Sequence, residues 1–523
     1  MRKKTFLFNW KDEILAGLSG GLLMAASFPP FPTRMLSLVA LVPLIRYFLV
    51  VFPESAGRKG SLKKGFWTGY FFGMTFFSVL LYWIANLIPE SPINMSWILF
   101  PAVLLFVLYL SCFTGLFTLA LSWLVKRFGK KALLTAPAIW ALTEFIRSSG
   151  ELAFSWGLIS SSLVPYPMAL QGLSIYGPFG FSMVIVLLNV LTGFVLFSRV
   201  KRQKIWALIV LITVIGSHLI YGNARMARVD RDISKMPSSK KIAIVQPNVG
   251  LGDKWKPAYR DSIFVQVESL TKKAAALGAD LVIFPETAAP VSISHSVRYR
   301  NWLKKISGSS GVDLLIGYIN HVKENGKWRS FNACGLFDNR GVLKAQYQKI
   351  NLLPFGEKVP FSQYIPVLEK IDFGQANFKQ GDNMTIFDSA AGKFGALICF
   401  ESTFTDYTRK YIKNGAQFLV NITNDGWFGN PRGALQHAET TVLRAVENGV
   451  FLVRAANTGI SMSIDPAGRV VESVGFDRES IIVAPVTIAR KMTFYCRYGQ
   501  LSFFLMFIGN LFIILLPALF QKH

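Results

Sequence analysis

The chain has 523 residues, of which 52% are hydrophobic and only 16% charged, and its mean hydropathy of +0.38 is too high for an ordinary soluble domain. The length allows at least two structural units, and the composition indicates that part of the chain crosses a membrane. The four cysteines and five histidines are scattered without metal-ligand spacing, which argues against a disulfide framework and a zinc site.

The first part of the chain, residues 1–222, consists of one apolar segment after another. Several segments approach or exceed the roughly 20 residues that a helix needs to cross a bilayer. Further spans follow the first one directly, so we do not expect a cleaved signal peptide. The pattern predicts seven spans in this domain, and an eighth in the C-terminal segment 499–521; they lie at about 13–30, 34–52, 66–88, 97–125, 132–148, 176–198, 205–222 and 501–520.

Basic residues gather in every second loop between these segments. Arg58, Lys59, Lys63 and Lys64 follow the second span, and similar groups precede the first span and follow the fourth and the sixth. The alternate loops contain almost none, as the positive-inside rule requires. We therefore expect both termini in the cytoplasm and the chain at the outer face near residue 222. The net charge of +26 is then largely a topology signal, and no nucleic-acid partner is expected.

One outer loop, residues 149–175, is semi-polar and rich in glycine, serine and aromatic residues. It has two interpretations: an interfacial connector anchored by a tryptophan, or a lip that admits a lipid to the outer domain. Glu144 and Arg147 lie three residues apart on one face of the preceding predicted helix. Charges near a membrane are usually paired or functional, and we expect a structural pair here.

The outer part, residues 235–490, changes to short β-branched runs that alternate with helical stretches. Helices are expected at about 257–277 and 297–307. This pattern predicts a layered α/β sandwich inserted between the seventh and eighth spans. The predicted strands lie at about 241–246, 280–284, 312–317, 332–338, 342–348, 384–388, 394–399, 416–422, 451–456 and 480–485.

Three reactive or charged side chains come at the ends of predicted strands: Glu286, Lys349 and Cys399. Each has an ordinary structural explanation, as a helix cap, a solvated lysine or a packed thiol. Together they are chemically coherent, because a carboxylate can take a thiol proton and an ammonium favours a thiolate and an oxyanion. A second carboxylate, Glu357, can hold the lysine or the base in place. The set suits acyl transfer through a thioester.

These residues also carry a resemblance to a known family. Glu286 in PET, Lys349 before LLPFGE and Cys399 in ICFES resemble the Glu-Lys-Cys triad of the nitrilase (carbon–nitrogen hydrolase) superfamily, whose fold is an αββα sandwich. Within that superfamily the chain most resembles its membrane branch, the apolipoprotein N-acyltransferases, over nearly its whole length. The other matching motifs are YQKxxLLPFGExVP at 347–360, NDGWFG at 424–429 and RAANTGIS at 454–461.

The resemblance implies a ping-pong acyl transfer at the outer face of the bacterial inner membrane. Cys399 would attack the sn-1 ester of a phospholipid, typically phosphatidylethanolamine. The acyl thioester would then pass to the α-amino group of the S-diacylglyceryl-cysteine at an apolipoprotein N-terminus. Glu286 would act as base in both steps, and Lys349 would support the oxyanion.

The same resemblance implies Glu357 and Glu401 as supporting carboxylates, and Trp255, Phe400 and Trp427 as substrate-contacting aromatic residues. The family often has tyrosine where this chain has Phe400. Segments 249–255 and 365–368 are either interfacial lids or ordinary surface loops. No cofactor or metal is indicated, and we expect a monomer.

Two other function classes stay open from the sequence. The first is a membrane-anchored, nitrilase-type amidase that hydrolyses its thioester with water. The second is a transporter or lipid-binding scaffold with an inert outer domain, although such a protein would be expected to carry more polar residues within its spans.

Overall fold

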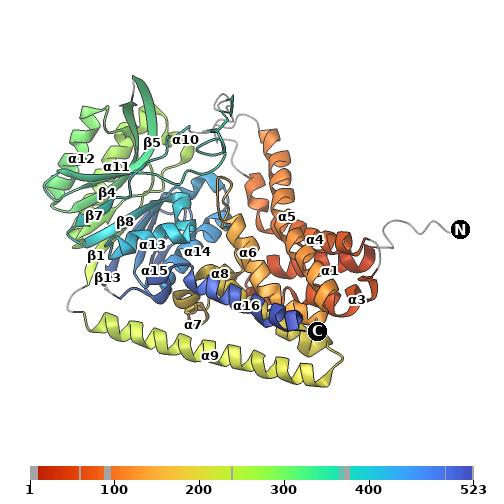
Figure 1. The fold of residues 1–523 in the computed structure, drawn as a ribbon. Helices are drawn as coiled ribbons and strands as arrows, with labels where there is room; N and C mark the ends of the chain where they lie inside the picture. The colour runs from red at the N-terminus through yellow and green to blue at the C-terminus, as the bar shows by residue number, and fades with distance from the viewer. Residues whose placement is uncertain are drawn as a thin grey trace. The chain divides into compact units, whose positions relative to one another are not determined.

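The computed structural model describes residues 10–57, 60–86, 96–236, 239–324, 326–362, 364–365, 367–368, 377–488 and 491–520. Their helices and strands are drawn in Figure 1. The chain divides into two compact units. The helical unit comprises Met1–Ala85, Trp97–Ala224 and Tyr498–His523, and the sandwich unit comprises Asn86–Ser96 and Arg225–Arg497.

The helical unit contains a helix at each of the eight predicted apolar segments. Among the described residues, four helical stretches are long and apolar enough to cross a membrane: Arg34–Glu54, Phe100–Phe128, Leu173–Phe197 and Lys201–Ser234. The complete eight-span topology stays a prediction. The principal helices are α1 (Lys11–Ala25), α2 (Val42–Arg46), α3 (Phe52–Ser55), α4 (Ser61–Leu80), α5 (Ser96–Phe128), α6 (Ala136–Arg147), α7 (Pro167–Leu170), α8 (Leu173–Phe197), α9 (Lys201–Ser234) and α16 (Leu501–Phe520).

The second predicted span is not one regular helix. Between Arg34 and Ser55 the chain forms a 3₁₀ turn, then α2, then the π-helical turn Tyr47–Val51, and finally α3. Pro43 and Pro53 fall in the first turns of α2 and α3. Proline has no N–H to donate and its ring clashes with the preceding turn. A regular α-helix is therefore interrupted before each of these prolines.

The 149–175 loop packs inside the helical unit. Glu144 accepts a hydrogen bond from the main-chain N–H of Ile159 at 2.8 Å. Arg147 donates to the main-chain oxygens of Phe154 and Trp156 at 3.1 and 2.6 Å. Trp156 is buried, so it is a packed side chain and not an exposed interfacial anchor. The two charges predicted as a structural pair therefore each hold the loop backbone.

The sandwich unit contains two sheets. The first has the order β13-β1-β2-β4-β5-β6, with β3 paired to β4, and the second has the order β12-β11-β10-β9-β8-β7. The strands of the first sheet are β1 (Lys240–Gln246), β2 (Leu281–Ile283), β3 (Ala289–Ser292), β4 (Asp313–Glu324), β5 (Lys327–Phe337), β6 (Leu343–Gln348) and β13 (Ser480–Val486). Those of the second are β7 (Ile386–Ser389), β8 (Gly392–Ile398), β9 (Phe418–Thr423), β10 (Leu452–Ala456), β11 (Ser461–Ile464) and β12 (Val470–Val474).

Successive side chains of a strand point to opposite faces of its sheet, and this gives the sandwich its layers. On β1, Ile242 and Ile244 share a buried cluster with Ile398 and Ile422 of the second sheet, so the two sheets pack face to face. The intervening β1 residues face helices α11 (Arg260–Ala276) and α12 (Val297–Ser310). Helices α13 (Thr405–Lys413) and α14 (Pro431–Asn448) pack against the second sheet. The unit is an αββα sandwich, as predicted.

Candidate active site

The predicted site residues lie just beyond the carboxyl ends of strands that run in the same direction within each sheet. β2 is parallel to β4, and β6 is also parallel to β4 because two antiparallel pairings separate them. β8 and β9 are parallel neighbours in the second sheet. The carboxyl ends of parallel strands are where α/β sheets place their ligand sites. Glu286, Lys349 and Cys399 follow β2, β6 and β8.

Glu286 is buried and has partners on both carboxylate oxygens. Its Oε1 accepts from Asn332 Nδ2 at 2.6 Å, and its Oε2 accepts from the main-chain N–H of Asn424 at 2.9 Å. Burial raises the pKa of Glu286, Lys349 opposes that rise, and the neighbouring carboxylate of Glu357 adds to it. A base with a raised pKa accepts a proton more readily, which suits it to receive one from a thiol.

Lys349 and Glu357 form a buried ion pair. Lys349 Nζ lies 2.7 Å from Glu357 Oε2, and the lysine side chain is 1% exposed. Burial alone would lower the pKa of Lys349, but Glu357, Cys399 and Glu286 together raise it, so the lysine is an ammonium. Asn332 Nδ2 also donates to Glu357 Oε1 at 2.9 Å. One amide therefore bridges the carboxylates of Glu286 and Glu357.

Cys399 lies one residue beyond β8, at the start of the 3₁₀ turn Cys399–Thr403. Its φ of 53° is left-handed, which costs a residue with a Cβ about 1–2 kcal/mol. Burial and the Glu286 carboxylate raise the pKa of the Cys399 thiol, and Lys349 opposes them. The resting group is therefore a neutral thiol, which must lose its proton to a base when it attacks.

Glu401 belongs to the same turn and is completely buried. Its Oε1 accepts from the Tyr347 hydroxyl at 2.6 Å and from the main-chain N–H groups of Ile350 and Asn351, both at 2.9 Å. Its Oε2 accepts from the N–H of Ile398 at 2.8 Å. Ile398 precedes Cys399 and Ile350 follows Lys349, so Glu401 joins the segment after β6 to the end of β8.

The three predicted aromatic contacts have different surroundings. Trp255 is 38% exposed, and Trp427 is half-buried in the turn Asp425–Phe428. Phe400 is 4% exposed, and its ring packs edge-on against Phe404 at 5.1 Å between centroids.

Sequence reasoning did not single out Lys254 and Asn332. Lys254 closes the short helix α10 (Leu251–Lys254), is 1% exposed, and donates from Nζ to the main-chain oxygen of Glu286 at 3.1 Å. The single lysine of the 249–255 segment therefore reaches the site. The only sequence signal for Lys254 was its place directly before Trp255. Asn332 lies within β5 and is not part of any motif.

This arrangement combines a buried base and a buried ammonium with a partly exposed thiol. The thiol can attack a carbonyl carbon while Glu286 takes its proton, and Lys349 can stabilise the negative oxygen that results. Within the described ranges, no three or more histidine, cysteine, aspartate or glutamate side chains gather as metal ligands. The arrangement is suited to covalent acyl chemistry on a cysteine.

Two family models match the chain, and their ranges follow its two structural units. The model described as carbon-nitrogen hydrolase matches residues 241–491, and the one described as apolipoprotein N-acyltransferase N-terminal domain matches residues 20–191. Among solved structures, the chain is similar to a mutant of the Nesterenkonia AN1 amidase from the nitrilase superfamily, with 19% identity and a TM-score of 0.40 over 52% of this chain and 99% of that one. Fold and site together define a membrane-associated protein with a carbon–nitrogen hydrolase domain.

Curated relatives narrow this class further. The chain is 30% identical to the apolipoprotein N-acyltransferase of Geobacter metallireducens, over 94% of this chain and 92% of that protein. It is 30% identical to the one of Allorhizobium ampelinum, over 92% of this chain and 91% of that protein. The chain belongs to the apolipoprotein N-acyltransferase family.

Proposed function

We propose that this enzyme transfers an acyl chain from a membrane phospholipid to the N-terminus of apolipoproteins, through a thioester on Cys399. The observation that carries the proposal is that Glu286, Lys349 and Cys399 follow the ends of β2, β6 and β8, and that Asn332 bridges Glu286 to Glu357, the partner of Lys349. Membership of the acyltransferase family supports the reaction class.

In the first half-reaction, Cys399 Sγ attacks the sn-1 ester carbonyl carbon of a phospholipid, with phosphatidylethanolamine as the expected donor. Glu286 takes the thiol proton, and Lys349 faces the developing oxyanion. When the tetrahedral intermediate collapses, the ester C–O bond breaks and Glu286 returns the proton to the departing oxygen. The products are the acyl thioester and a lysophospholipid.

In the second half-reaction, the α-amino group of an S-diacylglyceryl-cysteine attacks the thioester. Glu286 takes a proton from the attacking nitrogen, the C–S bond breaks, and Cys399 Sγ recovers a proton. Amine attack has to outcompete water, which a buried site favours by excluding solvent. Glu357 and Glu401 hold Lys349 and the ends of the strands in place.

We assign contact with the lipid chains to Trp255 and Trp427, whose rings are partly exposed, and a supporting position in the wall of the site to Phe400. Ile365 and Val367, 48% and 62% exposed, are apolar side chains of the segment 365–368. Exposed apolar side chains of this kind suit a lipid surface.

We place residues 1–222 and 499–521 in the bacterial inner membrane as seven spans and one, with both termini cytoplasmic. Residues 235–490 then lie on the periplasmic side, and the enzyme acts as a monomer. The alternation of basic loops supports this topology. An enzyme whose two substrates are both anchored in one leaflet needs its site at that surface.

The test is intact-mass spectrometry of the purified enzyme after incubation with phosphatidylethanolamine alone, beside Cys399→Ala. We expect a mass increase of one acyl chain that neutral hydroxylamine removes and that the variant lacks. A diacylglyceryl peptide with a free amine should discharge the adduct and gain the acyl chain. Discharge by water alone would favour the amidase, and absence of both adduct and activity would favour the inert scaffold.

A further inference from the structure

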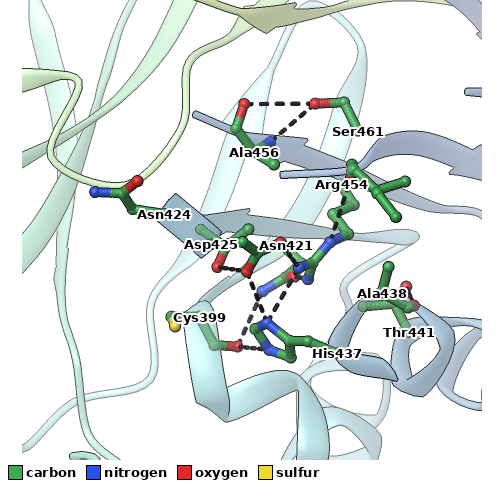
Figure 2. Close-up of polar contacts among 12 residues, drawn as sticks. Cys399, Asn421, Asn424, Asp425, His437, Ala438, Thr441, Arg454, Ala456 and Ser461 are labelled. Atoms are coloured by element: carbon green, nitrogen blue, oxygen red, sulfur yellow. Dashed lines mark hydrogen bonds and ion pairs between the residues drawn. The ribbon is translucent and has the colours of Figure 1, made fainter. Parts of the chain in front are cut away.

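A buried cluster of three charged or titratable side chains lies beside the main-chain carbonyl of Cys399 (Figure 2). His437 on α14 contacts Asp425 through Nδ1, at 2.9 Å from Oδ1. Arg454 on β10 pairs with Asp425 Oδ2 at 2.7 Å and lies 3.1 Å from His437 Nδ1. None of the three is more than 1% exposed. The catalytic steps described above use none of them.

The imidazole reaches the nucleophile through its other nitrogen. His437 Nε2 lies 3.3 Å from the main-chain oxygen of Cys399 and 3.3 Å from Ser402 Oγ. The Ser402 hydroxyl itself donates to the same carbonyl oxygen at 3.1 Å, and Asn421 Nδ2 donates to it at 3.3 Å. A neutral imidazole has one N–H and a hydroxyl one O–H, so there are two arrangements. With the ring proton on Nε2, His437 donates to the Cys399 carbonyl; with it on Nδ1, facing Asp425, Nε2 accepts from the Ser402 hydroxyl and Asn421 holds the carbonyl. His437 thus holds the Cys399 peptide directly in the first arrangement, and holds the neighbouring Ser402 in the second.

The charges of the cluster keep the ring in one state. Burial raises the pKa of Asp425, but Arg454 and His437 outweigh it and lower the pKa to about 2, so Asp425 is a carboxylate. Burial and the adjacent Arg454 lower the pKa of His437 below its ordinary value, against the opposing effect of Asp425. The ring is neutral near pH 7, and a fixed, oriented imidazole is suited to positioning.

The segment after β9 that contains Asp425 also contacts the base, Glu286. Asn424, next to Asp425, donates its main-chain N–H to Glu286 Oε2 at 2.9 Å. Asn457 Nδ2 holds the Asn424 side chain at 3.1 Å. The segment after β9 thus fastens Glu286 through Asn424 and Cys399 through Asp425 and His437. A rigid link of this kind keeps base and nucleophile at a fixed separation.

We propose that His437, oriented by Asp425 and Arg454, is a positioning residue that fixes the left-handed backbone of Cys399 and so aligns its thiol with Glu286. This inference rests on the proposed acyl transfer and adds a residue to its machinery. His437 acts through the Cys399 peptide and does not touch substrate.

A purely structural role for His437 makes a different prediction. Asparagine retains a polar atom near the position of Nδ1, and glutamine retains one near Nε2. His437→Asn therefore keeps a partner for Asp425 and loses the Cys399 contact, whereas His437→Gln does the reverse. If His437 only satisfies buried Asp425, the asparagine variant is the better replacement. If it positions Cys399, the glutamine variant is.

The experiment measures the single-turnover rate of acyl-enzyme formation from phosphatidylethanolamine, together with KM, in the full-length enzyme. Thr441→Ala is the matched control, because Thr441 is buried one turn further along α14 and its hydroxyl donates to Ala438 in the same helix. We expect His437→Asn to slow acylation by tenfold or more, up to about a hundredfold, since small misplacements of reacting groups have effects of this size. KM should stay within about twofold, and His437→Gln should recover a substantial part of the rate.

The rate at which iodoacetamide alkylates Cys399 needs no lipid and so separates the two proposals: if His437 positions Cys399, alkylation should be slower in His437→Asn than in His437→Gln. If the wild-type enzyme forms no acyl adduct, the acyl-transfer proposal fails, whatever the variants do. If it forms the adduct and His437→Asn acylates as fast as His437→Gln or faster, the positioning role is refuted. Should both variants fail to fold, Ser402→Ala tests the same contact: slower acylation with unchanged KM supports it, and a rate equal to that of Thr441→Ala overturns it.

Discussion

The ammonium of Lys254 donates a hydrogen bond to the main-chain oxygen of Glu286 at 3.1 Å, from a side chain that is 1% exposed. Burial lowers the pKa of Lys254 to about 7, although Glu286 opposes that effect. The lysine is thus charged below about pH 7 and loses its charge as the pH rises through that value. While charged, it helps to keep Glu286 ionised.

Lys254→Met should therefore move the acid limb of the pH–rate profile for acylation to higher pH. The acid limb reports loss of the ionised base, and removing a nearby positive charge raises the pKa of Glu286 further. Because Lys254 carries its proton below about pH 7, the effect should be largest in acid. The measurement is the rate of acyl-enzyme formation from pH 5 to 8. Lys256→Met, at an exposed lysine two residues along, should leave the limb in place, and equal profiles for both variants would contradict the prediction.

Asn332→Ala should slow acylation by about tenfold to a hundredfold. Asn332 donates to the carboxylates of both Glu286 and Glu357, and a hydrogen bond to a charged group contributes about 1.5–3 kcal/mol. Its loss lets two buried carboxylates move and repel. Single-turnover mass spectrometry gives the rate. Asn320→Ala, a similarly buried residue of β4 that bonds to Ser294, is the control and should stay near wild type.

Glu357→Gln should destabilise the sandwich unit far more than the same change at Glu324. Glu357 is the counter-ion of a lysine that is 1% exposed, and leaving a buried charge unpaired costs about 3–5 kcal/mol. Glu324 pairs with Lys379 at the surface, where the two side chains are 35% and 41% exposed, and such pairs contribute about 0–1 kcal/mol. Thermal denaturation in detergent, followed by near-ultraviolet circular dichroism, compares the two. Equal losses would show that the Lys349–Glu357 pair is not buried in solution.

Glu401→Gln should lower both the stability and the acylation rate. The buried carboxylate accepts four hydrogen bonds, and the amide NH₂ of glutamine cannot accept from the N–H of Ile398 if its oxygen serves the other three donors. A buried donor left without a partner costs about 1–3 kcal/mol. Melting temperature and single-turnover rate should fall together. Glu268→Gln, a partly exposed change on α11, is the reference, and identical behaviour of the two variants would refute the role given to Glu401.

Much of the fold could be predicted because its signals are local. The apolar segments and most strands of the sandwich are continuous runs in the sequence, and periodicity identifies such runs directly. The strands that sequence reasoning missed are β3, β11 and β12. β3 and β11 are buried but only four residues long, and β3 contains Pro290, whereas β12 is mostly exposed. None of the three has an apolar run long enough to show a pattern.

The sequence by itself determined the chemistry: a thiol, an ammonium and carboxylates at strand ends, in motifs whose residues are close neighbours in the chain. Only the tertiary structure decided which side chains surround them. Asn332 meets Glu286 across 46 residues, and Asn424 meets it across 138, because the order of strands in the sheets, which no local pattern encodes, brings their ends together. The left-handed backbone of Cys399 and its contact with His437 arise in the same way, since burial and hydrogen-bond partners are properties of the packed sheets and helices.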